Sequence, residues 1–325
     1  MSENMTHRVV FMGTPQFAVP ALEILLSNYQ VVGVVTQPDR PSGRGRKVRP
    51  SPVRALAERH GVTVLQPRSV QEPATVDRLR AWQADVIVVA AFGQLLPCSV
   101  LNLSPYGCVN VHASLLPRWR GAAPVAAAIL AGDAVTGVTL IKMDAGLDTG
   151  PILQQASLAI ETDDTRESLT VRLSQLGAEL LQGTLPDWLA GRIEPQAQDD
   201  SATTHAAQVT KEQGRINWQQ PADEIARKVR AFHPWPGTFT HWQGNPLKIV
   251  KATAVPGDLP AAPGQEDNQQ ASPVPGTVIA GPSGPGVMTG KGLLLLLEVQ
   301  PFCKRPMPAS AFARGARDFA GSRLA

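Results

Sequence analysis

An amide and an imidazole stand two residues apart, as Asn110 and His112, in an otherwise apolar stretch. The residues Val109–Val111 predict a short strand, and side chains two positions apart on a strand point to the same face. Pro117 then ends the stretch. Because ligands of open α/β sheets bind at the ends of strands, this pair predicts a small polar site there.

Two carboxylates lie on a second loop further along the chain. Asp144 and Asp148 flank a glycine turn that follows the predicted strand Gly137–Lys142. Either carboxylate could be the partner of His112. Both could instead make only local hydrogen bonds within the turn, as Asp side chains often do. The residue types leave both interpretations open.

An Asn, His and Asp site suits acyl transfer that proceeds without a covalent enzyme intermediate. The amide of Asn110 and a protonated His112 can donate hydrogen bonds to a developing oxyanion. A nearby carboxylate favours the protonated ring and orients it. The ring can then pass a proton to a leaving nitrogen. If the attacking group is a substrate amine, the chemistry needs no nucleophilic side chain.

Several other site types are disfavoured by motifs that the sequence lacks. The first predicted strand leads into Met12–Pro15 rather than into a Gly-x-Gly-x-x-Gly turn, and no Gly-x-x-x-x-Gly-Lys-Ser/Thr loop occurs. A dinucleotide dehydrogenase and a P-loop ATPase are therefore disfavoured. The sequence also has no serine nucleophile motif and no zinc cluster. We expect no metal.

The elements that must position these residues follow a strand and helix alternation. Short apolar runs alternate with helical stretches, which is the pattern of an open parallel α/β sheet. The predicted strands are Val9–Met12, Val31–Thr36, Val62–Leu65 and Val86–Ala90. The predicted helices are Pro20–Asn28, Ser51–His60, Val76–Gln83 and a long packing helix over 166–190.

The second half of the chain has a different character. A polar stretch at 194–207 predicts a linker between a domain over 1–193 and a domain over 208–325. Short strands with glycine turns in the latter predict a small β-barrel. These predicted strands are Thr238–Trp242, Leu247–Ala252, Gly276–Ala280 and Gly292–Gln300. The Pro-rich and Gln-rich stretch Pro256–Pro275 predicts an inserted loop.

Positive charge is concentrated in two places, although the net charge is only +3. The stretch Asp39–Arg54 carries six basic residues and one acid, and residues 205–325 carry a net charge of +5. This distribution fits a polyanion partner such as a nucleic acid. A solvated basic face would explain it equally well.

The composition indicates a protein that folds in a reducing compartment. Of 325 residues, 43% are hydrophobic and 18% charged, which is enough to bury the cores of two domains. Cys98, Cys108 and Cys303 share no metal-binding spacing, and we expect all three to be buried apolar residues. We identify no signal peptide and no apolar run long enough to span a membrane. A cytoplasmic protein is expected.

The chemistry-bearing segments closely resemble the folate-dependent formyltransferases. The resemblance is carried by Asn110-Val111-His112, Ser114-Leu115-Leu116-Pro117, Arg120-Gly121-Ala122-Ala123-Pro124 and Gly146-Leu147-Asp148-Thr149-Gly150. It implies a Rossmann-like domain that binds 10-formyltetrahydrofolate and an OB-like barrel behind it. It also implies that Asn110, His112 and Asp148 are the catalytic residues. The implied folate-binding residues are Ser114, Leu115, Leu116, Pro117, Phe92, Gly93 and Leu95.

Within this family, the resemblance is strongest to the members that formylate methionyl-tRNA, and it spans nearly the whole chain. It is carried by Phe11–Pro15, Thr36–Pro41, Gly43–Lys47, Ser51–Val53 and Arg230–Gly237. Ala113 and Met12 depart from the residues common in the family, but neither change removes a polar group. The resemblance implies a basic loop that contacts the tRNA acceptor end through Arg40, Arg44, Arg46, Lys47 and Arg49.

These expectations define the partners and two alternatives. The partners are initiator methionyl-tRNA, in the service of translation initiation, and tetrahydrofolate, and the enzyme is expected to be a monomer that contacts no membrane. One alternative is an N-formyltransferase that acts on an amino sugar or on glycinamide ribonucleotide, for which a long basic loop would be unnecessary. The other is a tRNA-binding protein without activity, against which the intact Asn110, His112 and Asp148 argue.

Overall fold

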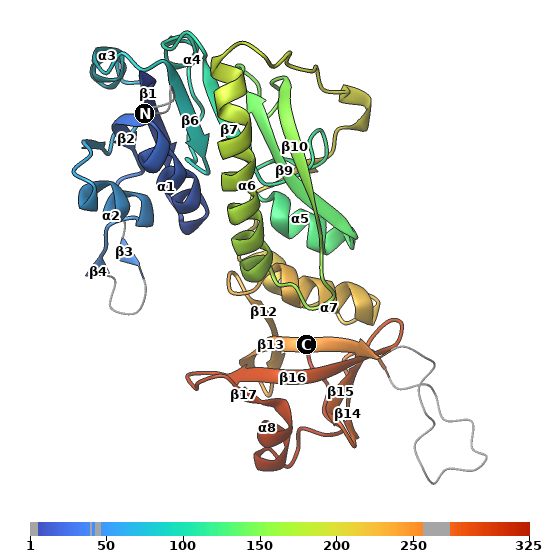
Figure 1. Ribbon diagram of the computed structural model, residues 1–325. Helices are drawn as coiled ribbons and strands as arrows, with labels where there is room; N and C mark the ends of the chain where they lie inside the picture. The colour runs from blue at the N-terminus through green and yellow to red at the C-terminus, as the bar shows by residue number, and fades with distance from the viewer. Residues whose placement is uncertain (1–5, 40, 43–46, 256–273) are drawn as a thin grey trace. The chain divides into compact units, whose positions relative to one another are not determined.

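The computed structural model describes residues 6–39, 41–42, 47–255 and 274–325, which form two compact units (Figure 1). The bulk of the second unit is Gln208–Ala325. Two short earlier segments, Ala126–Asp133 and Glu161–Glu167, also belong to it. The first unit contains the rest of the chain through Ala207. The predicted linker 194–207 therefore lies within the first unit.

A seven-stranded sheet forms the centre of the first unit, in the order β10-β9-β7-β6-β1-β2-β5. The five neighbouring strands β7, β6, β1, β2 and β5 are parallel. β9 pairs antiparallel with β7, and β10 pairs antiparallel with β9. This arrangement confirms the predicted open, mostly parallel sheet. The strands are β1 (Arg8–Gly13), β2 (Gln30–Val35), β5 (Val64–Leu65), β6 (Val86–Ala90), β7 (Cys108–His112), β9 (Val135–Lys142) and β10 (Ile152–Ala159).

The strand order reverses its direction of growth between β1 and β6. Chain order runs from β1 to β2 and β5 on one side, and from β6 to β7 on the other. Open α/β sheets bind their ligands outside the carboxyl ends of the strands at such a switch point. The loops after β1, β2, β6 and β7 are therefore placed where a ligand is expected.

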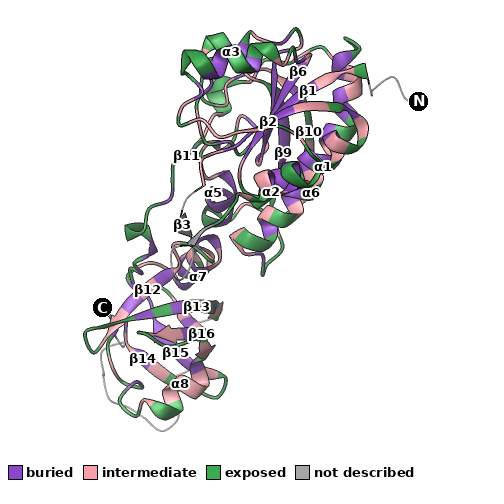
Figure 2. Ribbon diagram, turned by 90° about the vertical axis from the view of Figure 1, so that its left-hand side faces the viewer, coloured by how far each residue is buried: buried purple, intermediate pink, exposed green. Residues whose placement is uncertain are grey.

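Apolar side chains on both faces hold this sheet in the core. All five residues of β6 are buried, as its β-branched sequence predicts, and Figure 2 shows the central strands in the buried colour. One face packs on α3 and α4 through residues such as Val10, Ile87 and Leu79. The helices in this part of the chain are α1 (Val19–Asn28), α2 (Pro52–Arg59), α3 (Pro73–Ala81), α4 (Cys98–Leu101), α5 (Pro124–Ala131) and α6 (Arg166–Leu189), and most of α5 belongs to the second unit.

The long helix α6 packs tightly behind the strand that carries the predicted site. A Cβ atom on Gly177 would come within 2.8 Å of Cγ1 of Val111. Val111 lies between Asn110 and His112 in β7, so its side chain points to the opposite face. The absence of a side chain at Gly177 thus lets the helix support β7 from the side away from the polar residues.

Two pairs of short strands complete the first unit. The strands β3 (Pro41–Ser42) and β4 (Lys47–Val48) pair antiparallel at the base of the basic loop. The strands β8 (Arg120–Gly121) and β11 (His205–Ala206) pair parallel. Three 3₁₀ helices are also described, at Gln16–Ala18, Asp200–Ala202 and Glu212–Gly214, the last of them in the second unit.

A six-stranded antiparallel sheet forms the second unit, in the order β12-β13-β16-β15-β14 with β17 beside β16. The helices α7 (Ala222–Ala231) and α8 (Ala309–Gly315) pack on it around a core that includes Trp218, Leu294 and Phe319. The antiparallel domain is confirmed, and its barrel form stays a prediction. The strands are β12 (Thr238–Trp242), β13 (Asn245–Val255), β14 (Val278–Gly281), β15 (Gly284–Met288), β16 (Leu293–Pro301) and β17 (Met307–Pro308).

The three cysteines differ in exposure. Cys108 is buried at the start of β7, whereas Cys98 and Cys303 are exposed, so the expectation of three buried thiols was wrong for two of them. Burial raises the pKa of the Cys108 thiol to about 12. Among the helices of the described residues, none combines the length and apolar character that a membrane crossing requires.

Candidate active site at the end of strand β7

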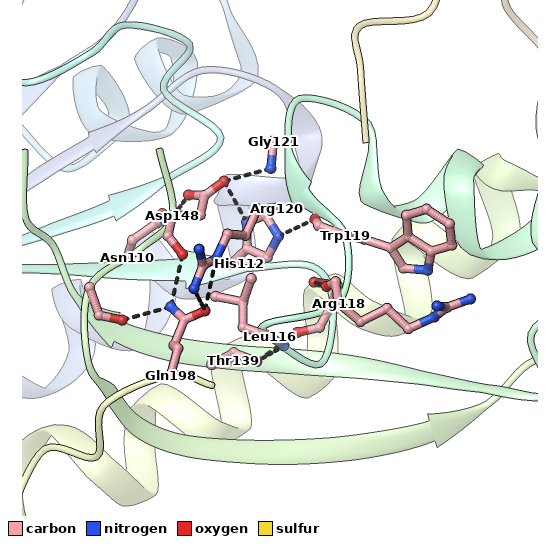
Figure 3. Close-up of polar contacts among 12 residues, drawn as sticks. Asn110, His112, Leu116, Arg118, Trp119, Arg120, Gly121, Thr139, Asp148 and Gln198 are labelled. Atoms are coloured by element: carbon pink, nitrogen blue, oxygen red, sulfur yellow. Dashed lines mark hydrogen bonds and ion pairs between the residues drawn. The ribbon is translucent and has the colours of Figure 1, made fainter. Parts of the chain in front are cut away.

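The structure brings Asn110, His112 and Asp148 into contact. The first two side chains are 8% and 6% exposed on one face of β7, and the loop between β9 and β10 carries Asp148 across that face (Figure 3). Oδ2 of Asp148 lies 3.5 Å from Nδ1 of His112. Nδ2 of Asn110 donates to Oδ1 of Asp148 at 3.3 Å. One carboxylate therefore orients both polar side chains of the strand.

The other carboxylate of the same loop has only a local role. Oδ1 of Asp144 accepts hydrogen bonds from the backbone N–H of Gly146 at 3.0 Å and from Oγ1 of Thr149 at 2.6 Å. The two interpretations that the sequence left open thus each apply to one residue. Asp144 shapes the turn, and Asp148 faces His112.

Both ring nitrogens of His112 face oxygen acceptors. Nε2 lies 3.0 Å from the carbonyl oxygen of Trp119, and Nδ1 faces Asp148. A carbonyl oxygen can only accept, so Nε2 carries a hydrogen and donates to it. The shorter contact therefore anchors the ring through Nε2, while Nδ1 is the nitrogen left to exchange a proton near Asp148.

Asp148 is also held by groups outside the predicted catalytic set. Its φ of +54° lies in the left-handed region, which Asp adopts more readily than most residues. The backbone N–H of Gly121 donates to its Oδ2 at 2.9 Å. Nε2 of Gln198 donates to its main-chain carbonyl at 2.8 Å and to that of Gly150 at 2.7 Å.

The segment 194–207 builds much of this support. Oε1 of Gln198 accepts from Nε of Arg120 at 3.0 Å and from Nη2 at 2.8 Å, and Nη2 also pairs with Asp200 at 2.9 Å. Arg120 is only 4% exposed, so its guanidinium needs these hydrogen-bond partners to offset the cost of burying its charge. Thr204 accepts from the backbone of Trp119 at 2.9 Å. Sequence reasoning missed these residues because a polar stretch without periodicity resembles a linker.

The predicted folate stretch 114–117 begins two residues after His112, and hydrogen bonds to Thr139 hold it in place. Oγ1 of Thr139 donates to the carbonyl of Ser114 at 2.7 Å and accepts from the backbone N–H of Leu116 at 3.0 Å. Ser114 itself is fully buried, and its Oγ donates to the carbonyl of Arg118 at 2.6 Å. The stretch, with Leu115 and Pro117, is therefore a rigid wall beside the polar cluster.

The other predicted folate residues differ in their surroundings. Phe92 is 2% exposed and packs in the core with Met12 and Val89. Gly93 has a φ of +79° and lines an open pocket, and Leu95 is 66% exposed. Gly93 and Leu95 are thus accessible to a ligand, whereas the Phe92 side chain belongs to the core.

That pocket has a volume of about 460 Å³ and lies at the carboxyl ends of β1 and β2. Its lining residues are Thr14, Pro15, Gln37, Pro38, Asp39, Arg49, Pro50, Ser51, Pro52 and Gly93. Thr14 accepts from the backbone N–H of Gln37 at 3.2 Å, and Thr36 contacts Ser51 at 2.9 Å. The pocket is therefore an open depression with hydroxyl and amide groups in its wall.

The basic loop starts and ends at this pocket. Of the predicted tRNA contacts, Arg40, Arg44 and Arg46 lie outside the described residues. Lys47 begins β4, where its backbone pairs with Ser42, and Arg49 is exposed at the pocket. The structure thus places the root of the loop at the ligand-binding edge of the sheet.

A polar network fixes the segment that leads into the loop. Nη1 of Arg54 pairs with Oδ2 of Asp39 and donates to Oε1 of Gln66 at 3.0 Å. Nε2 of Gln66 donates to Oδ1 of Asp39 at 2.9 Å and to the carbonyl of Gln37 at 3.0 Å. The start of the loop is therefore clamped to α2 and to the segment after β5.

The arrangement can stabilise negative charge on oxygen and move a proton. An amide nitrogen carries two hydrogens, so Asn110 can donate to Asp148 and to a reacting oxygen together. His112 can exchange a proton through Nδ1 while Nε2 stays anchored. Among the described residues, no group of three His, Cys, Asp or Glu side chains could hold a metal ion.

Comparison with known proteins identifies the family. Residues 7–185 match the formyl transferase family model, and residues 208–317 match the model of its C-terminal domain. A methionyl-tRNA formyltransferase of Roseiflexus sp. (strain RS-1) is 47% identical over 322 residues, which cover 98% of this chain and 96% of that protein. One of Methylococcus capsulatus is 47% identical over 98% of this chain and 99% of its own length.

A solved structure shows the same fold at much lower identity. A sugar 3N-formyl transferase, solved with dTDP and 5-N-formyl-THF, superposes with a TM-score of 0.66 at 17% identity. The match covers 92% of this chain and 99% of that one. With both domains matched and relatives that are 47% identical end to end, this chain belongs to the formyl transferase family.

Proposed function

We propose that this enzyme transfers a formyl group from 10-formyltetrahydrofolate to the α-amino group of methionyl-tRNA. The relatives named for that activity match nearly the whole chain, including the second unit. The observation that carries the chemistry is the contact of one carboxylate, Asp148, with both Asn110 and His112. These three residues are the proposed catalytic set.

In the proposed reaction, the amine nitrogen of the acceptor forms a bond to the formyl carbon, and the bond from that carbon to the folate nitrogen breaks. Nδ2 of Asn110 donates to the formyl oxygen as negative charge develops on it. Nδ1 of His112 accepts the proton that the attacking amine loses and delivers it to the leaving nitrogen. Asp148 stabilises the imidazolium that exists between these two transfers.

The two substrates are proposed to approach from different sides of this cluster. The wall formed by Ser114–Pro117, together with the accessible Leu95, is the proposed folate side, and Gly93 lies where this side meets the pocket beside Arg49. The pocket beside Arg49 at the root of the basic loop is the proposed acceptor side. Supporting this division, Arg49 brings positive charge to the pocket, and tRNA is a polyanion.

The second unit is proposed to bind the tRNA body. Residues 205–325 carry a net charge of +5. They contribute none of the three proposed catalytic residues. An added domain of this kind suits a large acceptor, whereas an amino sugar or glycinamide ribonucleotide needs no such contact. We further propose that the enzyme acts as a monomer in the cytoplasm and specifically on initiator tRNA.

A formylation assay with purified protein, 10-formyltetrahydrofolate and charged initiator tRNA tests the proposal. We expect N-formylmethionyl-tRNA and stoichiometric tetrahydrofolate, with much lower turnover on charged elongator tRNA. Glycinamide ribonucleotide and a nucleotide-linked amino sugar serve as competing acceptors in the same assay. If either of these were formylated and the tRNA were not, the proposed acceptor would be wrong, but the proposed formyl transfer would stand. No formylation of any acceptor while tRNA still binds would support the inactive alternative.

A further inference from the structure

One half-buried amide supports the loop that carries Asp148. The Nε2 group of Gln198 donates at 2.8 Å to the main-chain carbonyl of Asp148 and at 2.7 Å to that of Gly150 (Figure 3). The two acceptors stand on either side of Thr149, so a single NH₂ group fixes both ends of this short stretch. Both hydrogens of the amide are used in these two bonds.

The orientation of this amide is set by its second partner. The oxygen of Gln198 accepts two hydrogen bonds from the buried guanidinium of Arg120, which can only donate. A flipped amide would place its NH₂ against the guanidinium and its oxygen against two carbonyls. Gln198 therefore has one satisfied orientation, and it links the loop of Asp148 to the strand β8 that follows the folate stretch.

The same strand also contacts the Asp148 carboxylate directly. The backbone N–H of Gly121, next to Arg120, donates to Oδ2 of Asp148 at 2.9 Å. Gly121 pairs with Ala206 of β11, and a Cβ atom on Gly121 would lie 2.7 Å from the carbonyl oxygen of Ala206, so a glycine is needed for this close approach of the two strands. Gly121 thus holds the Asp148 carboxylate directly, and its neighbour Arg120 holds the Asp148 backbone through Gln198.

We propose that Gln198 is a positioning residue, which sets the place of Asp148 relative to Nδ1 of His112. This inference rests on the proposed catalytic role of Asp148. At φ +54° the Asp148 backbone is in a conformation that few residues adopt readily, and the bond to its carbonyl holds it there. Without that bond the Asp148 backbone can relax, and the carboxylate then shifts relative to the ring although Gly121 and Asn110 still contact it. Misplacement of a reacting group by about 1 Å can cost about 100-fold in rate.

The test compares Gln198→Leu and Gln198→Glu with the matched control Gln196→Leu in the full-length protein. Gln196 lies two residues earlier with an exposed side chain. We expect kcat to fall about 10-fold or more in both Gln198 variants, with the KM for the formyl donor within about twofold. Gln198→Glu keeps the length and the acceptor for Arg120, so it isolates the two donor bonds even if Gln198→Leu fails to fold. The control should keep the kcat of the natural enzyme.

A double-mutant cycle decides whether the effect passes through Asp148. In an Asp148→Asn background, where the carboxylate is already gone, adding Gln198→Glu should change the residual kcat by less than about twofold. An equal loss in both backgrounds would overturn the positioning role, as would an unchanged kcat in the single variants. A near-normal kcat in Asp148→Asn alone would instead overturn the proposed catalytic set, which keeps the two failures distinguishable.

Discussion

Two loops at the ligand edge of the sheet are held by the same device, an arginine paired with a glutamine. Near the polar cluster, Arg120 donates to Gln198, whose NH₂ holds the carbonyls of the Asp148 loop. At the root of the basic loop, Arg54 donates to Gln66, whose NH₂ holds Asp39 and a main-chain carbonyl. The hydrogen-bond pattern is alike, although the sequences around the two pairs differ.

The two pairs differ in burial, and burial decides what each can do. The Arg120 side chain is 5% exposed, whereas that of Arg54 is 32% exposed and also pairs with Glu58 on its own helix. A buried charged group that loses its partner is strongly destabilising, while a pair that is partly open to solvent contributes less. The inner pair therefore fixes reacting atoms, whereas the outer pair fixes the segment that leads into the basic loop less firmly.

The largest effect is expected at the cluster itself. Asn110→Ala, His112→Ala and Asp148→Ala should each lower kcat by at least about 100-fold, which is the typical loss when one oxyanion donor is removed. Single-turnover formylation measures this effect, and thermal unfolding serves as the control for folding. If any of the three variants turned over normally, that residue would leave the proposed catalytic set.

Truncation separates the inner region from the second unit. A chain that ends at residue 207 keeps Gln198 and β11, so we expect it to bind folate but to formylate charged tRNA poorly. A chain that ends at 193 loses both and should also lose folate affinity. Titrations with folate and with charged tRNA at two salt concentrations measure this difference.

We also expect the chain that ends at residue 207 to have a lower free energy of unfolding than the full-length protein. The segment Ala126–Asp133 belongs to the second unit, where Arg227 donates to the carbonyl of Leu130 at 3.2 Å. Removing α7 therefore leaves the carbonyl of Leu130, at the end of α5, without this hydrogen bond. If the chain that ends at 207 kept full tRNA affinity and turnover, the whole tRNA site would have to lie in the first unit.

Replacing Arg44, Arg46 and Lys47 with Ala should affect only the tRNA step. We expect the KM for charged tRNA to rise about 10-fold. The slope of log KM against log salt concentration should fall by up to about three, because fewer phosphates are neutralised. Folate affinity should stay unchanged. If folate affinity were lost while tRNA affinity stayed intact, the loop would belong to the folate site. The proposed difference in role between the two loops would then be wrong.

The smallest effect is expected at the outer pair. Gln66→Leu removes the donor to Asp39 and to the Gln37 carbonyl, which loosens the start of the basic loop. We expect the KM for charged tRNA to rise about two- to threefold with kcat at saturation unchanged, since this partly exposed pair contributes less than a buried one. Initial rates over a tRNA concentration series measure both constants. A fall in kcat as large as that of Gln198→Leu would erase the distinction between inner and outer pairs.

Much of the fold could be predicted from local patterns. The buried strands β1, β2 and β6 stand out as β-branched runs, and Ser51 with Pro52 marks the start of α2, where Ser51 indeed caps the backbone N–H of Arg54. The strands that escaped prediction have weaker patterns. β10 carries two glutamines, and β15 contains two glycines and a proline. Their places are set by pairing with neighbours, which a local pattern does not contain.

The site was predictable in part for the same reason. Asn110 and His112 share a strand, so their common face follows from the spacing alone. The choice of Asp148 over Asp144, and the support from Gln198, depend on contacts across 38 and 50 residues. A polar segment that packs by hydrogen bonds alone has no hydrophobic periodicity to reveal it, so 194–207 resembled a linker.

The uneven exposure of the three thiols makes this enzyme ready for distance measurements. Cys98 is exposed in the first unit and Cys303 in the second, while Cys108 is buried with a pKa of about 12 and stays unreactive at neutral pH. A maleimide spin label or fluorophore pair should therefore mark one position in each unit without any engineered cysteine. The distance between the two labels can then be measured with and without charged tRNA.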